Sequence, residues 1–223
     1  MYDIIIIGSG PAGLFCAYLL ALEGYRPLVL ERGACVEERK KDVDRFWETG
    51  VLDPSSNVQF GEGGAGTFSD GKLNTLVKDK TGRNRFVLET FVKFGADKDI
   101  LYANKPHIGT DVLIDLVSQM RQEIISLGGE FCFHTQVTDV NLTSKTLKIV
   151  HLSENSAEEV SAGAAVFAIG HSARDTFEML YKHQIPMRAK SFAVGVRIEH
   201  PQTLIDHSQY GRDRGYDSMI ILH

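Results

Sequence analysis

The chain has 223 residues, of which 43% are hydrophobic and 24% charged, and its net charge is −5 at pH 7. This composition is typical of a soluble globular protein with one large domain or two small ones. The acidic balance disfavours a nucleic-acid partner, and because no apolar stretch approaches the ~18 residues of a membrane span we expect no membrane partner and a cytoplasmic location.

The first predicted elements are a strand, a glycine-rich turn and a helix. Residues 2–7 are continuously apolar, which is typical of a buried parallel strand. The turn consists of Gly8, Ser9, Gly10, Pro11, Ala12 and Gly13, and the helical pattern after it ends at Gly24. In such a turn the first glycine allows a sharp bend, the second lets backbone approach a pyrophosphate, and the third lets helix and strand pack closely. The start of the helix then offers N–H groups to the phosphates.

The second predicted strand, residues 27–30, ends in Glu31 and Arg32. A carboxylate at this place accepts hydrogen bonds from a ribose, so the order of elements predicts a dinucleotide site that includes both residues. Residues 36–49 are predicted to be helical, and the mixed-sign run at residues 37–41 is interpreted as a solvated helix face.

A glycine-rich segment follows, with five glycines between residues 61 and 71. One interpretation is a flexible surface loop. The other is that Gly63, Gly64 and Gly66 let backbone pass against the cofactor, because glycine-dense loops admit ligands to the main chain. We then expect Thr67 and Ser69 to donate hydroxyl hydrogen bonds, and Lys72 to pair with a phosphate or a carbonyl group of the cofactor.

Helices and short strands alternate in the rest of the chain. The predicted helices are residues 83–94, 111–127 (capped by Thr110 or Asp111) and 174–183, and the predicted strands are residues 130–134, 137–142, 146–152, 158–161, 164–169 and 192–198. We expect an α/β, Rossmann-like fold with a parallel central sheet, helices on one face and a three-stranded antiparallel meander on the other. Residues 1–185 would form the cofactor domain, and residues 186–223 the start of a second, substrate-binding or cap region.

Three features favour FAD over NAD as the dinucleotide: the meander, the strand end Ala168-Ile169-Gly170, and the glycine-rich loop. With these features the chain resembles the two-dinucleotide-binding-domain flavoproteins related to glutathione reductase. The resemblance implies that Glu31 holds the adenosine ribose, that Val137 offers backbone atoms to adenine, and that Ala168 and Gly170 lie near the cofactor. Ile169 stands where that group has threonine.

A narrower resemblance rests on residues 61–73 and 170–176, which look like those of uncharacterised bacterial FAD-dependent dehydrogenases described as NAD(FAD)-utilizing. It implies an oxidoreductase that transfers electrons between FAD and an unidentified small molecule, with NAD(P)H as a candidate donor. The alternatives are a tRNA-modifying flavoprotein, an isoprenoid-chain reductase, or a non-catalytic dinucleotide-binding module. The sequence predicts no particular oligomeric state.

The spacing of motifs identifies no catalytic residue. Related disulfide reductases carry a redox cysteine pair, whereas Cys16, Cys35 and Cys132 are scattered, so we expect neither dithiol chemistry nor a metal site. His107 and His171 are the candidates for contact with cofactor or substrate. The apolar run at residues 218–223 has no partner segment after it, and we expect the chain to be the N-terminal part of a longer enzyme.

Overall fold

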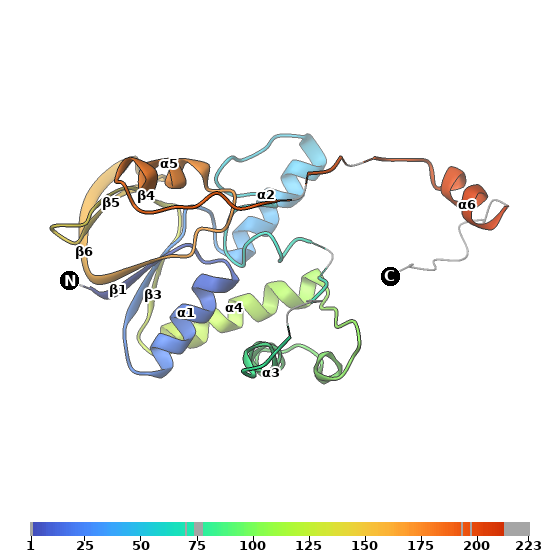
Figure 1. Cartoon of the computed structure of the whole chain (residues 1–223), viewed down its shortest axis with the longest axis horizontal. Coiled ribbons are helices and arrows are strands. Elements are labelled where there is room, and N and C mark those ends of the chain that lie inside the picture. The colour runs from blue at the N-terminus through green and yellow to red at the C-terminus, as the bar shows by residue number, and fades with distance from the viewer. Residues whose placement is uncertain (1, 70, 74–77, 193, 197, 212–223) are drawn as a thin grey trace. The chain divides into compact units, whose positions relative to one another are not determined.

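The computed structural model describes residues 2–69, 71–73, 78–192, 194–196 and 198–211. The chain divides into two compact units, Met1–Pro186 and Met187–His223. The assignment of FAD to the first and of substrate to the second stays a prediction. The elements of the first unit are β1 (Tyr2–Ile7), α1 (Pro11–Leu22), β2 (Pro27–Leu30), α2 (Val36–Thr49), α3 (Arg83–Lys93), a 3-10 helix (Lys98–Leu101), α4 (Thr110–Ser126), β3 (Glu130–Cys132), β4 (Thr135–Asn141), β5 (Thr146–His151), β6 (Ser156–Phe167) and α5 (Arg174–Lys182) (Figure 1).

The strands form one mixed sheet in the order β3-β2-β1-β6-β5-β4. The first four are parallel, and β4, β5 and β6 form an antiparallel meander. Two strands predicted separately, residues 158–161 and 164–169, are instead the single strand β6. It is continuous because residues 156–161 pair with β5, whereas Ala162 and the residues after Gly163 pair with β1.

The two faces of the parallel strands carry separate apolar clusters, since successive side chains of a strand point to opposite faces. Ile6 and Val29 pack with side chains of α1 and α4. Ile5 and Ile7 pack with β4, β5 and α5. Figure 1 shows α1 and α4 on one side of the parallel strands, and α5 and the meander strands β4 and β5 on the other. The predicted α/β fold with parallel strands and an antiparallel meander is confirmed. The helices are not restricted to one face, because α5 packs on the same side as the meander.

The predicted cap of α4 is wrong. Gly109 is the N-cap residue without a side-chain cap, and Thr110 is already the first helical residue. The start of α4 is held by the glycine-rich loop instead: Ile108 N donates to Gly71 O at 3.0 Å, and Leu73 N donates to Pro106 O at 3.0 Å. The Thr110 hydroxyl contacts Ser69 O at 3.4 Å.

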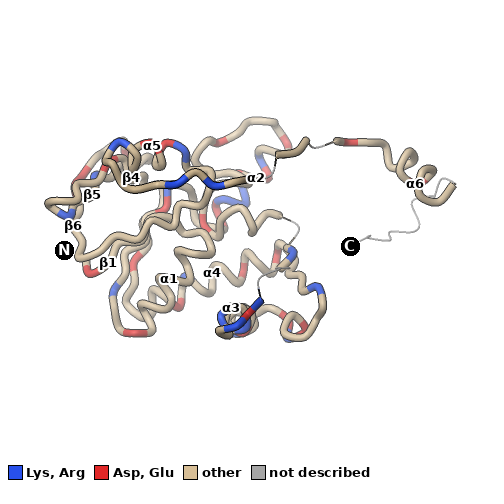
Figure 2. The backbone as a smooth tube through the Cα atoms, viewed as in Figure 1, with Lys and Arg blue, Asp and Glu red and all other residues tan. Residues whose placement is uncertain are grey.

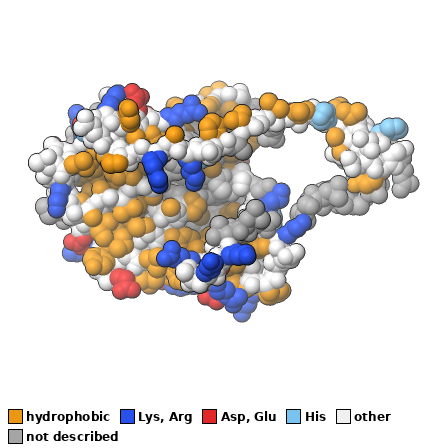
Figure 3. Space-filling model, in the orientation of Figure 1, with side chains coloured by type: hydrophobic (Ala, Val, Ile, Leu, Met, Phe, Trp, Pro, Cys, Tyr) orange, Lys and Arg blue, Asp and Glu red, His pale blue; other side chains and the backbone are white. Residues whose placement is uncertain are grey.

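The second unit contains α6 (Gln202–Tyr210), which the sequence did not predict. The strand predicted at residues 192–198 is wrong for the part of it that is described. Residues 192, 194–196 and 198 lie in no strand, and Phe192, Val194, Val196 and Ile198 are 67–84% exposed. A strand needs a hydrogen-bonded neighbour, and this segment has none among the described residues. Figure 3 shows apolar side chains along the extended segment before α6, and the run at residues 218–223 lies outside the described residues.

Charged residues of both signs are interspersed along the first unit, and α3 carries both (Figure 2). In the described part of the chain, no helix combines the length and apolarity needed to cross a bilayer. The same residues contain no group of three or more His, Cys, Asp or Glu side chains that could hold a metal ion.

Candidate functional site

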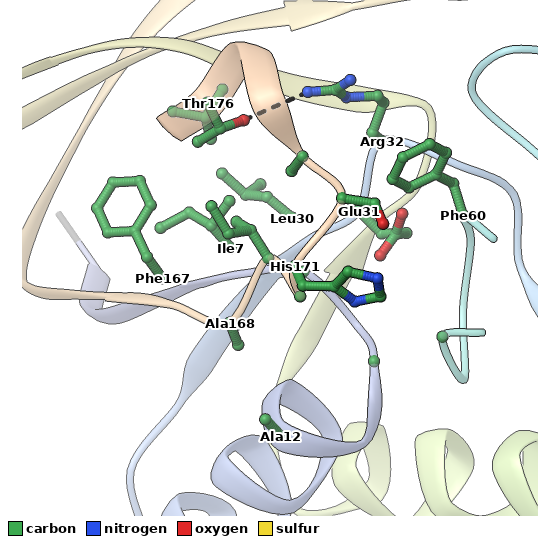
Figure 4. Close-up of a pocket in the computed structure, with 18 of the residues that line it drawn as sticks. Ile7, Ala12, Leu30, Glu31, Arg32, Phe60, Phe167, Ala168, His171 and Thr176 are labelled. Atoms are coloured by element: carbon green, nitrogen blue, oxygen red, sulfur yellow. Dashed lines mark hydrogen bonds between the residues drawn. The ribbon is translucent and has the colours of Figure 1, made fainter. Parts of the chain in front are cut away.

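A cavity of about 450 Å³ lies at the carboxyl ends of β1 and β2. Its volume falls in the range of about 300–1,000 Å³ that is common for ligand sites. Figure 4 shows Ile7 and Leu30 from the two strands, with Glu31, Phe60 and His171 close to one another and Ala12 at the start of α1. The residues predicted to bind cofactor that line this cavity are Gly8, Gly10, Pro11, Ala12, Glu31, Arg32, Gly64, Val137, Ala168 and Gly170.

The turn between β1 and α1 has the close contacts that require glycine. Gly8 has a φ of +99°, and a Cβ there would lie 2.6 Å from Ala168 O. A Cβ on Gly13 would lie 1.9 Å from Gly8 O, so Gly13 packs beneath the turn and does not line the cavity. At Gly10 the nearest atom to such a Cβ is Gly64 Cα at 3.8 Å, which leaves room on the cavity side. The first N–H groups of α1 lack intrahelical acceptors and are available to a ligand.

Glu31 is held by backbone and by Ser9. Its Oε2 accepts hydrogen bonds from the N–H and the hydroxyl of Ser9, both at 2.8 Å, and its Oε1 accepts one from Gly33 N at 2.8 Å. Because a carboxylate has about four acceptor positions, three bonds leave one free for a ribose hydroxyl. Ser9 itself is buried and does not line the cavity, so its role is to orient Glu31.

Arg32 closes the opposite end of the cavity from the glycine turn. Its guanidinium lies 2.6 Å from Asp175 Oδ2 and 3.4 Å from the Thr176 hydroxyl, both at the start of α5. The amide of Gln136 donates to the same Asp175 carboxylate at 3.1 Å. The Val137 side chain is buried in the apolar cluster beneath the meander, so only its backbone can meet a ligand.

The glycine-rich loop is anchored to the rest of the site. Gly63 N donates to Ser9 O at 2.9 Å, and Glu62 N donates to Ala34 O at 3.1 Å. Gly64 has a φ of +68° and lies against the Gly10–Pro11 turn. These contacts hold residues 62–64 beside the cavity, and binding of a ligand by the loop stays a prediction.

The structure divides the predicted loop residues between two cavities. Gly64 lines the 450 Å³ cavity, whereas Gly66, Thr67, Ser69 and Lys72 line a second cavity of about 120 Å³ that reaches α4. The Ser69 hydroxyl donates to Gly66 O at 2.8 Å. Of the two candidate histidines, His171 lines the first cavity, and His107 lines neither but pairs through its backbone with Lys72.

Arg39 organises the glycine-rich loop, and the interpretation of residues 37–41 as a solvated face is wrong at this position. The side chain is fully buried and donates to five backbone oxygens, those of Asn57, Val58, Gly61, Glu62 and Gly64, at 2.6–3.3 Å. Burial lowers the pKa of Arg39 to about 10, so the guanidinium stays charged at neutral pH. A sequence signal existed, because Arg39 shares the helical spacing of the buried Val36 and Val43.

Glu62 is a second buried charged residue that the sequence did not reveal. Its Oε2 accepts a hydrogen bond from Val36 N at 2.7 Å, at the start of α2. Its Oε1 lies 3.4 Å from Arg121 Nε, an ion pair without hydrogen-bond geometry. Burial raises the pKa of Glu62 to about 7, although Arg121 opposes this shift. Glu62 therefore joins the loop to α2 and α4.

The raised pKa of Glu62 predicts a pH dependence of stability. The folded state holds the Glu62 proton more tightly than the unfolded state does. The resulting contribution to the free energy of unfolding is therefore complete below about pH 4.5 and is lost as the pH rises through about 7. Relative to Glu62→Gln, the unfolding free energy of the wild type should fall by about 3 kcal/mol over this interval. Urea denaturation across the pH range measures this difference. Glu89→Gln, at an exposed carboxylate paired with Arg85, is the control and should follow the wild type. If the unfolding free energies of Glu62→Gln and wild type change with pH in the same way, the raised pKa of Glu62 is contradicted.

The comparisons with known proteins agree with the geometry. A family model described as "Pyridine nucleotide-disulphide oxidoreductase" matches residues 2–180. The chain belongs to this family. The pyridine nucleotide-disulphide oxidoreductase match covers the whole sheet and the first cavity. Residues 191–220 match a second family model, "FAD-dependent protein, C-terminal domain-like". Together the two matches support FAD as the cofactor.

One sequence relative and one solved structure are similar to this chain. An uncharacterized protein of Clostridium beijerinckii is 48% identical over 215 residues, which are 96% of this chain and 39% of that protein. The chain thus spans well under half of its relative. The crystal structure of Thermovibrio ammonificans THI4 is similar with a TM-score of 0.51 and 19% identity, covering 83% of this chain and 64% of that one. This likeness shows the shared fold.

Proposed function

We propose that the chain is the dinucleotide-binding part of an FAD-dependent dehydrogenase, which moves electrons between FAD and a small organic substrate, with NAD(P)H as the candidate donor. The observation that carries the proposal is the 450 Å³ cavity, which is lined both by the open side of Gly10 and by Glu31 with its free acceptor position. These two features match the charge and the hydroxyl groups of an adenosine diphosphate.

Each part of the cavity would hold a different part of the cofactor. Gly10, Ala12 and Gly64 would present backbone to the pyrophosphate, and Glu31 would accept a ribose hydroxyl. The backbone at Val137 would meet adenine, and Gly170, exposed at the end of the β6 segment, would lie along the chain that leads to the flavin. When bound, FAD supplies the hydride- or electron-accepting group, so the chemistry needs no protein nucleophile.

The cysteines of this chain favour a dehydrogenase over dithiol chemistry. Cys16, Cys35 and Cys132 are free and partly buried. Burial raises the pKa of all three thiols, which lowers their thiolate fraction and therefore their reactivity. Within this chain, electrons would pass through the flavin and not through a protein disulfide.

A visible absorption spectrum tests the proposal. The chain, purified and incubated with FAD, should retain it through gel filtration and show a flavin spectrum. Dithionite or NAD(P)H should bleach that spectrum, and air should restore it. Glu31→Gln should weaken retention, because an amide replaces one carboxylate acceptor with a donor. A protein that retains no FAD would contradict the proposal, and one that retains FAD but is never reduced would favour a binding module without turnover.

A further inference from the structure

The second cavity lies on the helix side of the sheet, between the glycine-rich loop, α1, α3 and α4. Its volume is about 120 Å³. Its lining residues are mainly apolar, and Leu14, Leu113, Leu116, Val117 and Met120 among them are buried. Gly66, Ser69 and Lys72 are exposed and mark its open side. The cavity shares Pro11 with the dinucleotide cavity and is otherwise lined by different residues.

The size of the cavity limits its occupant to one small ring or a short chain. A protein cavity of about 150 Å³ lined by aliphatic and aromatic side chains holds one benzene molecule. A cavity of about 120 Å³ is therefore too small to enclose the three fused rings of a flavin. An ionic occupant is disfavoured, because buried Leu and Met side chains cannot replace the water that a charge would lose.

The wall of the cavity includes the hydroxyl of Thr67. Thr67 is 3% exposed, and its hydroxyl makes no hydrogen bond within the part of the chain that the structure describes. Gly63 leaves space for this hydroxyl: a Cβ on Gly63 would lie 2.2 Å from Thr67 Oγ1 and 3.3 Å from Val117 Cγ2. Since all three residues line the cavity, the hydroxyl is presented among its wall atoms. A hydroxyl that faces a cavity in this way can exchange a hydrogen bond with a ligand oxygen.

We propose that this cavity binds a small uncharged organic molecule, a hydrocarbon ring or short chain with one hydroxyl or carbonyl oxygen. The hydrocarbon part packs against Leu116 and Met120, and the oxygen forms a hydrogen bond with Thr67. The inference concerns a site distinct from the dinucleotide cavity and does not depend on the proposed redox function.

Phenol and benzene are the probes, because they share a ring and differ by one hydroxyl. The chain is labelled with ¹³C at its methionine methyl groups, incubated with excess FAD and titrated with each probe by NMR. The Met120 methyl lies in the cavity wall, whereas Met179 packs in the cluster on the other face of the sheet. Phenol should shift the Met120 signal in a saturable manner and leave the Met179 signal unchanged.

Variants separate the hydrogen bond from the apolar contacts. Thr67→Val should weaken phenol binding roughly 3- to 10-fold and leave benzene binding unchanged, and Thr67→Ser should restore the preference for phenol. Val117→Ile, which adds a methylene to the wall, should weaken both probes. An unshifted Met120 signal would overturn the proposal, as would equal losses of both probes in Thr67→Val. If phenol binds only in the absence of FAD, the cavity belongs to the cofactor site, and this result would also overturn the proposal. Should Thr67→Val fail to fold, the affinities of Thr67→Ser and wild type for the two probes still decide.

Discussion

Replacement of Gly64 by Val is expected to abolish FAD retention while the sheet stays folded. Gly64 has a φ of +68°, which a β-branched residue adopts only at a cost of about 1–3 kcal/mol. A Cβ there would lie 3.0 Å from Pro11 Cδ and 3.2 Å from Gly10 Cα. The branched side chain must therefore push the loop away from the turn or fill the place proposed for the pyrophosphate. The ratio of flavin to protein after gel filtration measures the effect.

Gly24→Val is the matched control for this substitution. Gly24 has a φ of +83°, so valine is strained there as well, but no atom lies within 4 Å of the added Cβ. This variant should lose some stability and keep its FAD. If Gly64→Val retains as much FAD as the wild type, the loop does not lie against the cofactor and the proposed site is wrong.

The second large effect is expected at Arg39. Arg39→Met preserves most of the side-chain volume but removes the donors that five backbone oxygens share. Because buried acceptors without partners are costly, the unfolding free energy should fall by at least about 3 kcal/mol. The glycine-rich loop should also lose its position, so FAD retention should fall. Urea denaturation and flavin content measure the two effects.

Two further variants sharpen the Arg39 experiment. Arg39→Lys keeps the charge but not the planar array of donors, and it should restore little of the loss. Arg45→Met changes the same residue type on the same helix, where the side chain is half exposed and pairs with Asp42 at 3.1 Å. It should change stability by no more than about 0.5 kcal/mol. Equal effects at positions 39 and 45 would refute the role given to Arg39.

Local pattern predicted much of the fold. The bounds of β1, β2 and α2 agree with the sequence, because an apolar run or a helical period between glycines is set by neighbouring residues. Prediction failed where distant partners decide. The two halves of β6 were separated because nothing local shows that one strand pairs with β5 and then with β1. The segment at residues 192–198 has the alternating apolar residues of a strand, but no hydrogen-bonded neighbouring strand among the described residues.

The candidate site divides in the same way. The turn at Gly8–Gly13 and the carboxylate of Glu31 belong to one continuous motif, and the structure places most of it around a single cavity. Glu62 was missed because its burial arises only when the glycine-rich loop folds back onto α2. Arg39 was missed although it shares the helical spacing of Val36 and Val43, because charged side chains are mostly exposed. The separation of Gly64 from Thr67 and Lys72 likewise depends on α4, which lies far along the chain from the loop.

The position of β6 beside β1 has a consequence for synthesis of the protein. β1 and β2 leave the ribosome early, but the other neighbour of β1 is among the last elements of the first unit. Until β6 emerges, β1 has an unpaired edge, and an edge of this kind can pair with other chains. Gly8 also contacts Ala168 only after β6 has emerged. Pairing of β1 with β6 joins residues far apart in the sequence, and such non-local pairing is intrinsically slow. The nascent chain therefore completes the nucleotide-binding turn only in a late step.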